Sequence, residues 1–75
     1  ARVRARRSGA VGVVAYLGRT HFKPGRWVGV ILDNSALGRH DGEVDSVRYF
    51  VTPRRAKSGV FLRVAAVDLV GAQYE

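Results

Sequence analysis

The chain has 75 residues, which is enough for one small domain and too few for a doubly wound sheet or a barrel enzyme. Hydrophobic residues make up 47% of it, as in folded proteins, and the lack of cysteine excludes disulfides and thiolate metal sites and favours a reducing, intracellular setting. Thirteen basic and six acidic residues give a net charge of +7, and residues 1–32 hold seven of the basic residues and no acidic residue. Such a one-sided field favours an anionic partner, which could be nucleic acid, an acidic peptide or a lipid surface.

Short apolar runs between glycines and prolines predict β-strands and no helices. We place the strands near residues 2–6, 11–17, 27–33, 47–51, 60–64 and 66–70. The run 27–32 is apolar on both faces and is predicted to be the central strand, with 11–17 beside it. Residues 18–26 and 33–46 are predicted loops, and long loops on a small scaffold usually carry function. The fold class is therefore predicted as all-β, a small and strongly bent antiparallel sheet or barrel with long glycine-rich loops.

The second predicted loop carries a family resemblance. Its segment Gly38-Arg39-His40-Asp41-Gly42 resembles the Gly-Lys-Asn-Asp-Gly signature of CAP-Gly domains. Other segments match in the same order and at nearly the same spacing: Gly12-Val13-Val14, Tyr16-Leu17-Gly18, Phe22 to Val30, Leu32-Asp33, Val47 to Phe50 and Gly59 to Arg63. The resemblance covers roughly residues 9–70, preceded by a basic strand or flexible head at 1–8 and followed by a tail at 71–75.

The resemblance implies an SH3-like β-domain of cytoskeletal proteins. Such domains bind acidic C-terminal tails that end in an aromatic residue, as on α-tubulin and end-binding proteins, so the implied role is a microtubule-associated binding module in the cytoplasm. The tail-binding residues it implies are Phe22, Trp27, Gly38, Arg39, His40, Gly42, Phe61 and Arg63. The chain departs from the family in a longer, more basic loop at 53–58 and in an apolar stretch at 64–66, where a polar stretch is usual.

The physical chemistry of the loop agrees with a carboxylate receptor. Gly38 and Gly42 bracket a tight turn that could present backbone N–H groups to a ligand. Arg39 offers a planar pair of donors suited to a carboxylate, and His40 can donate from a ring nitrogen. Asp41 would repel an anionic tail, so its expected role is structural, as an acceptor for N–H groups of the loop.

The aromatic residues allow two readings. Phe22 and Trp27 are by default core residues of a small domain, and Trp27 could bury one face while leaving an edge in a groove. Phe61 and Arg63 are two apart on a predicted strand, so they share one face, opposite an aliphatic one. A face that bears Phe and Arg suits a binding surface.

The central tripeptide also has open alternatives. Arg39-His40-Asp41 could be only a polar turn, although its context favours binding. His40 either takes up a proton when an anionic tail binds, or replaces the asparagine of the family signature as a neutral donor. The two hypotheses differ in the pH dependence that they predict for tail binding.

The rival function is an SH3-like nucleic-acid binder. It would use the arginine-rich head at 1–7 and the basic loop at 53–58, with Tyr16, Phe22 or Trp27 as stacking platforms. Under the leading hypothesis, nucleic acid binds only nonspecifically, membranes do not bind and the isolated domain is a monomer. We expect no enzyme activity, no metal site and no cofactor, because no nucleophile, base or phosphate-binding motif converges.

Overall fold

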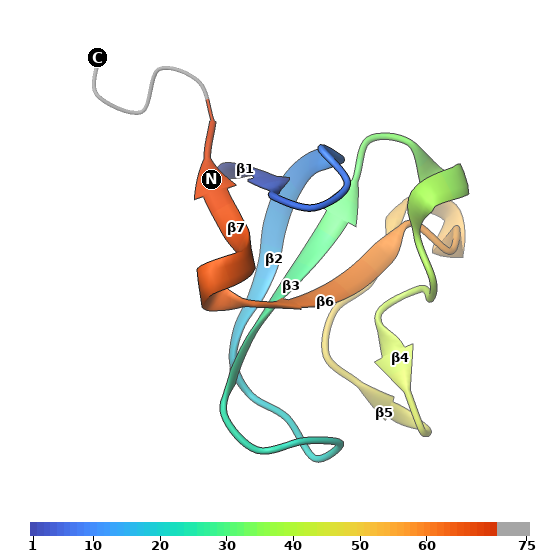
Figure 1. The fold of residues 1–75 in the computed structure, drawn as a ribbon. Coiled ribbons are helices and arrows are strands. Elements are labelled where there is room, and N and C mark those ends of the chain that lie inside the picture. Colours follow the sequence, from blue (N-terminus) through green and yellow to red (C-terminus); the bar gives the residue numbers. More distant parts are fainter. Residues whose placement is uncertain (71–75) are drawn as a thin grey trace.

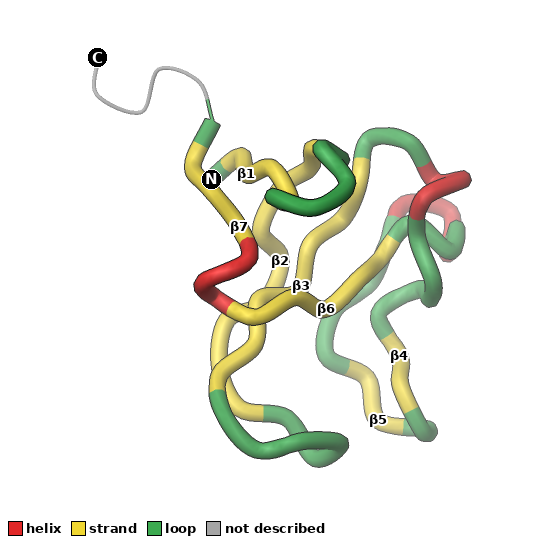
Figure 2. The backbone as a smooth tube through the Cα atoms, in the orientation of Figure 1, coloured by secondary structure: helices red, strands yellow, loops and turns green. Residues whose placement is uncertain are grey.

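Residues 1–70 are described by a computed structural model, and the predicted tail at 71–75 lies outside the described residues (Figures 1 and 2). Seven strands and three short 3-10 helices make up this part of the chain. The strands are β1 (Arg2–Ala5), β2 (Val11–Arg19), β3 (Arg26–Leu32), β4 (Glu43–Val44), β5 (Val47–Arg48), β6 (Gly59–Arg63) and β7 (Val67–Leu69). The 3-10 helices are η1 (Ser35–Leu37), η2 (Pro53–Arg55) and η3 (Val64–Ala66). The prediction of an all-β fold is confirmed.

Five strands form one antiparallel sheet in the order β6-β3-β2-β1-β7. The prediction that residues 27–32 form the central strand is wrong. These residues belong to β3, which is an interior strand, and the central strand of the five is its neighbour β2. The pairing of β2 with β3 shifts register between Val14 and Tyr16, and such a bulge bends a strand pair. After β6, η3 turns the chain so that β7 returns to pair with β1 (Figure 1). Residues 2–5, left open as a strand or a flexible head, form β1.

A separate two-stranded hairpin, β4–β5, lies beside the main sheet (Figure 1). The sequence placed residues 43–44 in a loop and expected a strand over 47–51, and both expectations are corrected here. The two residues between the strands, Asp45 and Ser46, have φ values of 51° and 68°. Hairpin turns with two positive φ values normally carry glycine or asparagine, so this turn gave no recognisable signal.

The main sheet carries aliphatic side chains on one face and aromatic rings on the other. Its aliphatic face forms the core, made of the buried residues Val3, Ala10, Val28, Val30 and Leu32. On β6 the side chains alternate as a strand requires: Val60 and Leu62 pack against this core, and Phe61 points to the opposite face. That opposite face carries aromatic rings, and it positions the candidate site.

Candidate functional site

Phe61 lies at the centre of a cluster of aromatic rings. Its ring centroid is 5.2 Å from that of Phe22 and 5.3 Å from that of Tyr49. Further rings lie at centroid distances of 5.4 to 5.9 Å from Phe61, and they belong to His40, Phe50 and Tyr16. The Phe and Tyr rings meet Phe61 edge-to-face or tilted, and the His40 ring stacks on it, so together they form an apolar surface.

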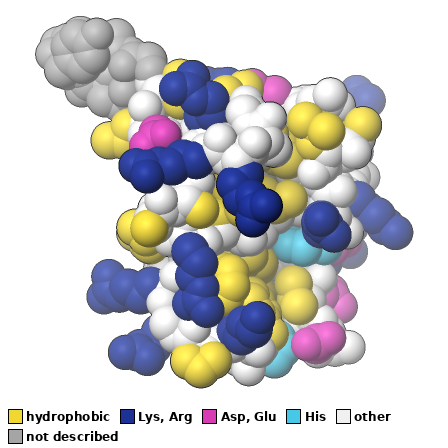
Figure 3. All heavy atoms as spheres, in the orientation of Figure 1, with side chains coloured by type: hydrophobic (Ala, Val, Ile, Leu, Met, Phe, Trp, Pro, Cys, Tyr) yellow, Lys and Arg dark blue, Asp and Glu magenta, His cyan; other side chains and the backbone are white. Residues whose placement is uncertain are grey.

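A groove of about 400 Å³ opens beside this cluster. The residues that line it are Phe22, Arg39, His40, Val44, Val60, Phe61 and Leu62. The lining thus combines apolar walls with two nitrogen donors and contains no carboxylate. Figure 3 shows Lys and Arg side chains spread over this side of the molecule, with hydrophobic surface exposed between them.

Backbone hydrogen bonds hold the loop 38–42 against the start of β6. The N–H groups of Arg39 and His40 both donate to the Gly59 carbonyl oxygen, over 2.9 and 3.2 Å, and the Gly59 N–H donates back to the His40 carbonyl over 2.7 Å. The Gly42 N–H donates to Nδ1 of the His40 ring over 3.0 Å. These three N–H groups of the loop are therefore occupied, and the expectation that they face a ligand is wrong for them. The side chains of Arg39 and His40 line the groove.

The two loop glycines serve this packing. Gly42 has a φ of +100°, which L side chains rarely adopt, and a Cβ at this position would overlap the Phe50 carbonyl oxygen. A Cβ at Gly38 would overlap the Lys57 carbonyl oxygen. Both glycines are thus needed for close approach of neighbouring backbone, and neither lines the groove.

His40 is held as a neutral donor. Because Nδ1 accepts the Gly42 N–H, this nitrogen carries no proton and the ring hydrogen sits on Nε2. Burial of the ring, which stacks on Phe61 at 5.4 Å, lowers the pKa of His40, and the charge of Asp41 offsets this effect only in part. Protonation of Nδ1 would break the Gly42 bond. The geometry therefore favours the neutral-donor hypothesis over proton uptake.

Asp41 is engaged within its own segment. Its Oδ1 accepts the Glu43 N–H over 3.2 Å, and Arg48 donates to its backbone oxygen over 3.1 Å. Arg48 also donates to the Phe50 carbonyl over 2.8 Å and to the Glu43 carboxylate over 3.0 Å. Burial raises the pKa of Asp41, but the Glu43 N–H and Arg48 outweigh it and leave this pKa below its usual value. Arg48 thus ties the candidate loop to β4 and β5.

Trp27 and Arg63 lie next to each other, outside the groove lining. The Arg63 guanidinium sits 4.0 Å from the Trp27 ring centroid and donates to the Pro24 carbonyl over 2.8 Å. Trp27 Nε1 donates to the Lys23 carbonyl over 3.2 Å. These contacts hold the 20–25 segment against the end of β6. That both residues bind the tail, as the resemblance implies, stays a prediction.

The positive charge is partly neutralised within the fold. Arg2 pairs with Asp33, and its hydrogen bond lowers the pKa of that carboxyl group. Arg6 pairs with Asp68 over 2.8 Å. The basic head is therefore less available to an anionic partner than the sequence suggested.

Sequence reasoning gave no role in the site to Tyr49, Phe50 or Arg48. One signal could have located Phe50. Gly29 interrupts an apolar strand, and its missing side chain leaves space that the Phe50 ring fills. A glycine inside a strand commonly marks such a close approach.

Among residues 1–70, no three His, Cys, Asp or Glu side chains gather to hold a metal ion. In the same part of the chain, no helix has the length and apolar character to cross a membrane.

Comparison with known proteins identifies the family. The CAP-Gly domain family model matches residues 1–67. Mouse tubulin-folding cofactor B is 50% identical over 58 residues, which cover 77% of this chain and 22% of that protein. The chain spans 3% to 22% of the length of curated relatives that it matches, so it corresponds to a small part of each.

Solved structures of CAP-Gly domains also superpose on this fold. The CAP-Gly domain of human kinesin-like protein KIF13B superposes with a TM-score of 0.80 at 30% identity, covering 96% of this chain and 69% of that one. The Bik1 CAP-Gly domain, solved with an ETF peptide from Bim1, superposes with a TM-score of 0.72 at 26% identity, covering 87% of this chain and 76% of that one.

Proposed function

This chain belongs to the CAP-Gly family, and we propose that it is a microtubule-associated module that binds acidic C-terminal tails ending in an aromatic residue. The observation that supports this most is the composition of the groove. Its aromatic and aliphatic walls stand beside the Arg39 guanidinium and the Nε2–H of His40, with no carboxylate in the lining. A ligand that combines an aromatic ring with an anionic end matches such a surface.

Each part of the tail has a counterpart in the site. The terminal ring packs against the surface formed by Phe22 and Phe61, and the terminal carboxylate accepts hydrogen bonds from Arg39 and His40. Among residues 1–70, the Arg39 side chain has no hydrogen-bond or ion-pair partner, so its donors are available. Charge-assisted bonds of this type are roughly twice as strong as neutral ones. Gly38, Gly42 and Asp41 support the loop.

The names of related proteins support the source of the tails. The Bik1 domain was solved with an ETF peptide, which in one-letter code contains an acidic and an aromatic residue. The mouse relative is a tubulin-folding cofactor. The partners that we propose are the tails of α-tubulin and end-binding proteins, which places the module in the cytoplasm at microtubules.

The nucleic-acid alternative has less support. Arg2 and Arg6 are ion-paired, and of the three proposed stacking platforms, Trp27 is covered by Arg63 while Tyr16 and Phe22 pack in the aromatic cluster. The field of a chain with net charge +7 still attracts nucleic acid without specificity at low salt.

Titration with matched peptides tests the proposal. An acidic peptide ending in tyrosine with a free carboxylate is compared with its C-terminally amidated twin and with a version that lacks the tyrosine. We expect micromolar binding of the first, on the order of −7 to −8 kcal/mol, and clear losses for both controls. Equal affinity for all three peptides would leave only nonspecific charge attraction and refute the proposed function.

A further inference from the structure

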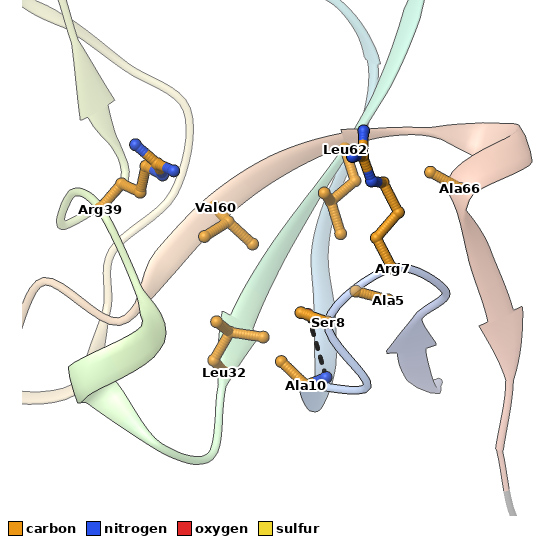
Figure 4. Close-up of a pocket in the computed structure, with 9 residues that line it drawn as sticks. All are labelled: Ala5, Arg7, Ser8, Ala10, Leu32, Arg39, Val60, Leu62 and Ala66. Atoms are coloured by element: carbon orange, nitrogen blue, oxygen red, sulfur yellow. Dashed lines mark hydrogen bonds between the residues drawn. The ribbon is translucent and has the colours of Figure 1, made fainter.

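A second hollow, of about 220 Å³, lies next to the groove (Figure 4). Its apolar lining consists of Ala5, Ala10, Leu32, Val60, Leu62 and Ala66. Ala5, Ala10 and Leu32 are buried, so residues of the core form the floor of the hollow. Three of the apolar residues are alanines, and these short side chains create the space that larger ones would fill.

The hollow adjoins the groove. Arg39, Val60 and Leu62 line both of them. Val60 and Leu62 are two apart on β6 and therefore present the same face of that strand. A peptide bound in the groove can thus pass Arg39 and reach the hollow without leaving the surface of the domain.

The charges around the hollow are of one sign. Figure 4 shows Arg39 on one side and Arg7 on the other, with Val60, Leu32 and Leu62 between them. Ser8, the remaining polar residue of the lining, accepts the Ala10 N–H over 3.1 Å and is occupied. No carboxylate lines the hollow, and among residues 1–70 Arg7 has no ion-pair partner. A ligand that suits this surface is apolar at its centre and anionic on both sides.

We propose that the hollow is a second subsite for the same acidic tail, and that it takes an aliphatic side chain upstream of the terminal aromatic residue. An acidic residue on one side of that aliphatic residue pairs with Arg7. The acidic residue on the other side shares the Arg39 guanidinium with the terminal carboxylate, because its five N–H donors can serve two carboxylates. This inference rests on the proposed function, because the aromatic end in the groove fixes which part of the tail reaches the hollow. It makes the domain selective for tails with an acidic–aliphatic–acidic pattern, beyond the aromatic end.

A leucine scan tests the subsite. The parent probe is a peptide of Glu and Gly that ends in Glu-Glu-Tyr with a free carboxylate, and each variant replaces one Gly upstream by Leu. Fluorescence anisotropy gives the affinity of each peptide. Burial of a leucine side chain favours binding, and ordering the peptide opposes it. The balance predicts that affinity rises about five- to twentyfold at one position of the scan and not at the others.

Two pairs of protein variants show whether the gain comes from this hollow. Ala66→Leu fills it, and Ala65→Leu adds the same side chain at the exposed neighbouring position, outside the lining. We expect Ala66→Leu to abolish the leucine gain while leaving the affinity for the parent peptide unchanged, and Ala65→Leu to preserve both. Arg7→Ala should weaken the leucine peptide more than Arg4→Ala, which removes an equal charge outside the lining.

Methyl NMR of the unmodified protein gives an independent readout if Ala66→Leu fails to fold. The methyl groups of Ala10 and Leu32 line the hollow but not the groove, so they should shift with the preferred leucine peptide and not with the parent. If the parent binds through its tyrosine and carboxylate but no leucine position improves affinity, the subsite is refuted and the proposed function stands. If the parent binds no better than its amidated twin, the proposed function fails, and the subsite fails with it.

Discussion

Arg39 contributes an exposed positive charge to the loop, and His40 contributes one oriented hydrogen-bond donor. The Arg39 side chain is exposed and has no partner among residues 1–70, so it is available to a ligand. The His40 ring is half-buried against Phe61 and fixed through Nδ1, so it offers a single oriented donor. The sequence proposes both residues for the site. The structure adds that His40 Nδ1 accepts a hydrogen bond, which leaves Nε2 as the donor.

Arg39→Ala should weaken tail binding and leave the fold intact. Loss of hydrogen bonds to a charged group predicts a decrease in binding free energy of about 1.5–3 kcal/mol. The free energy of unfolding should change by less than about 0.5 kcal/mol, because the side chain is exposed. Peptide titration and thermal unfolding measure the two effects. If the melting temperature collapses while tail affinity survives, Arg39 is a structural residue.

His40 should give stability a specific pH dependence. Burial lowers the pKa of the folded-state imidazole below its ordinary value of 6.5, so the unfolded chain binds more protons at mildly acidic pH. The stability contributed by the neutral ring is thus complete above 6.5 and is lost as pH falls from there through the folded-state pKa. Urea unfolding of the native protein and of His40→Asn between pH 7.5 and 5.5 should show a steeper loss for the native protein. Parallel profiles would contradict a buried neutral ring.

The pH dependence of tail affinity should differ from that of stability. Because the ring donates from Nε2 without taking up a proton, the affinities of the native protein and of His40→Asn should run parallel from pH 7.5 to 6.5. A rise in affinity on acidification that vanishes only in His40→Asn would restore the proton-uptake hypothesis. The peptide titration repeated at several pH values distinguishes these outcomes.

At the level of elements, the site depends on how the loop 38–42 joins β6 and the β4–β5 hairpin. Gly59 holds the loop through three backbone hydrogen bonds, and Arg48 connects it to the hairpin. Sequence reasoning located the loop because its glycines and charges are local signals. It missed the hairpin because the turn at 45–46 lacks glycine, and it missed Arg48 because its partners become neighbours only after folding.

Gly42→Ala should destabilise the loop far more than Gly9→Ala. Both glycines have positive φ, +100° and +77°, so both variants carry backbone strain. A Cβ at Gly42 would also overlap the Phe50 carbonyl, whereas at Gly9 nothing lies within 4 Å. Strain alone predicts about 1 kcal/mol for Gly9→Ala, and Gly42→Ala should cost several times more and reduce tail affinity. Equal losses in denaturant unfolding would mean that the contact with Phe50 relaxes freely.

For the whole molecule, the sequence was enough to predict features that depend on a local pattern, such as the strands. It was not enough to predict contacts between segments far apart in the chain. The apolar run 27–32 and its partner 11–17 do form adjacent interior strands. The return of β7 to β1 and the ion pairs of Arg2 and Arg6 join residues far apart in the chain. The charge count therefore overstated the free positive charge of the head. Trp27 and Arg63 lie against each other because the antiparallel pairing of β3 with β6 places them directly opposite, which also depends on contacts between distant segments.

Raising the salt concentration should distinguish binding by long-range charge attraction from binding in the groove. Raising salt from about 0.1 M to about 1 M shortens the screening length from roughly 10 Å to roughly 3 Å. Residual binding of the amidated and tyrosine-free peptides should then disappear, whereas the tyrosine-ended peptide should weaken but remain measurable, because ring burial is not screened. Convergence of all three affinities at high salt would show that the field alone carries binding.

The central claim is that Arg39 contacts the terminal carboxylate of the tail, and a double-mutant cycle tests it most directly. Affinities are measured for the native protein and Arg39→Ala, each with the free-acid and the amidated tyrosine peptide. We predict that amidation costs much less in Arg39→Ala than in the native protein, with a coupling energy of about 1–3 kcal/mol for a direct charged pair. Equal costs of amidation in both proteins, and hence no coupling, would contradict the contact and the function built on it.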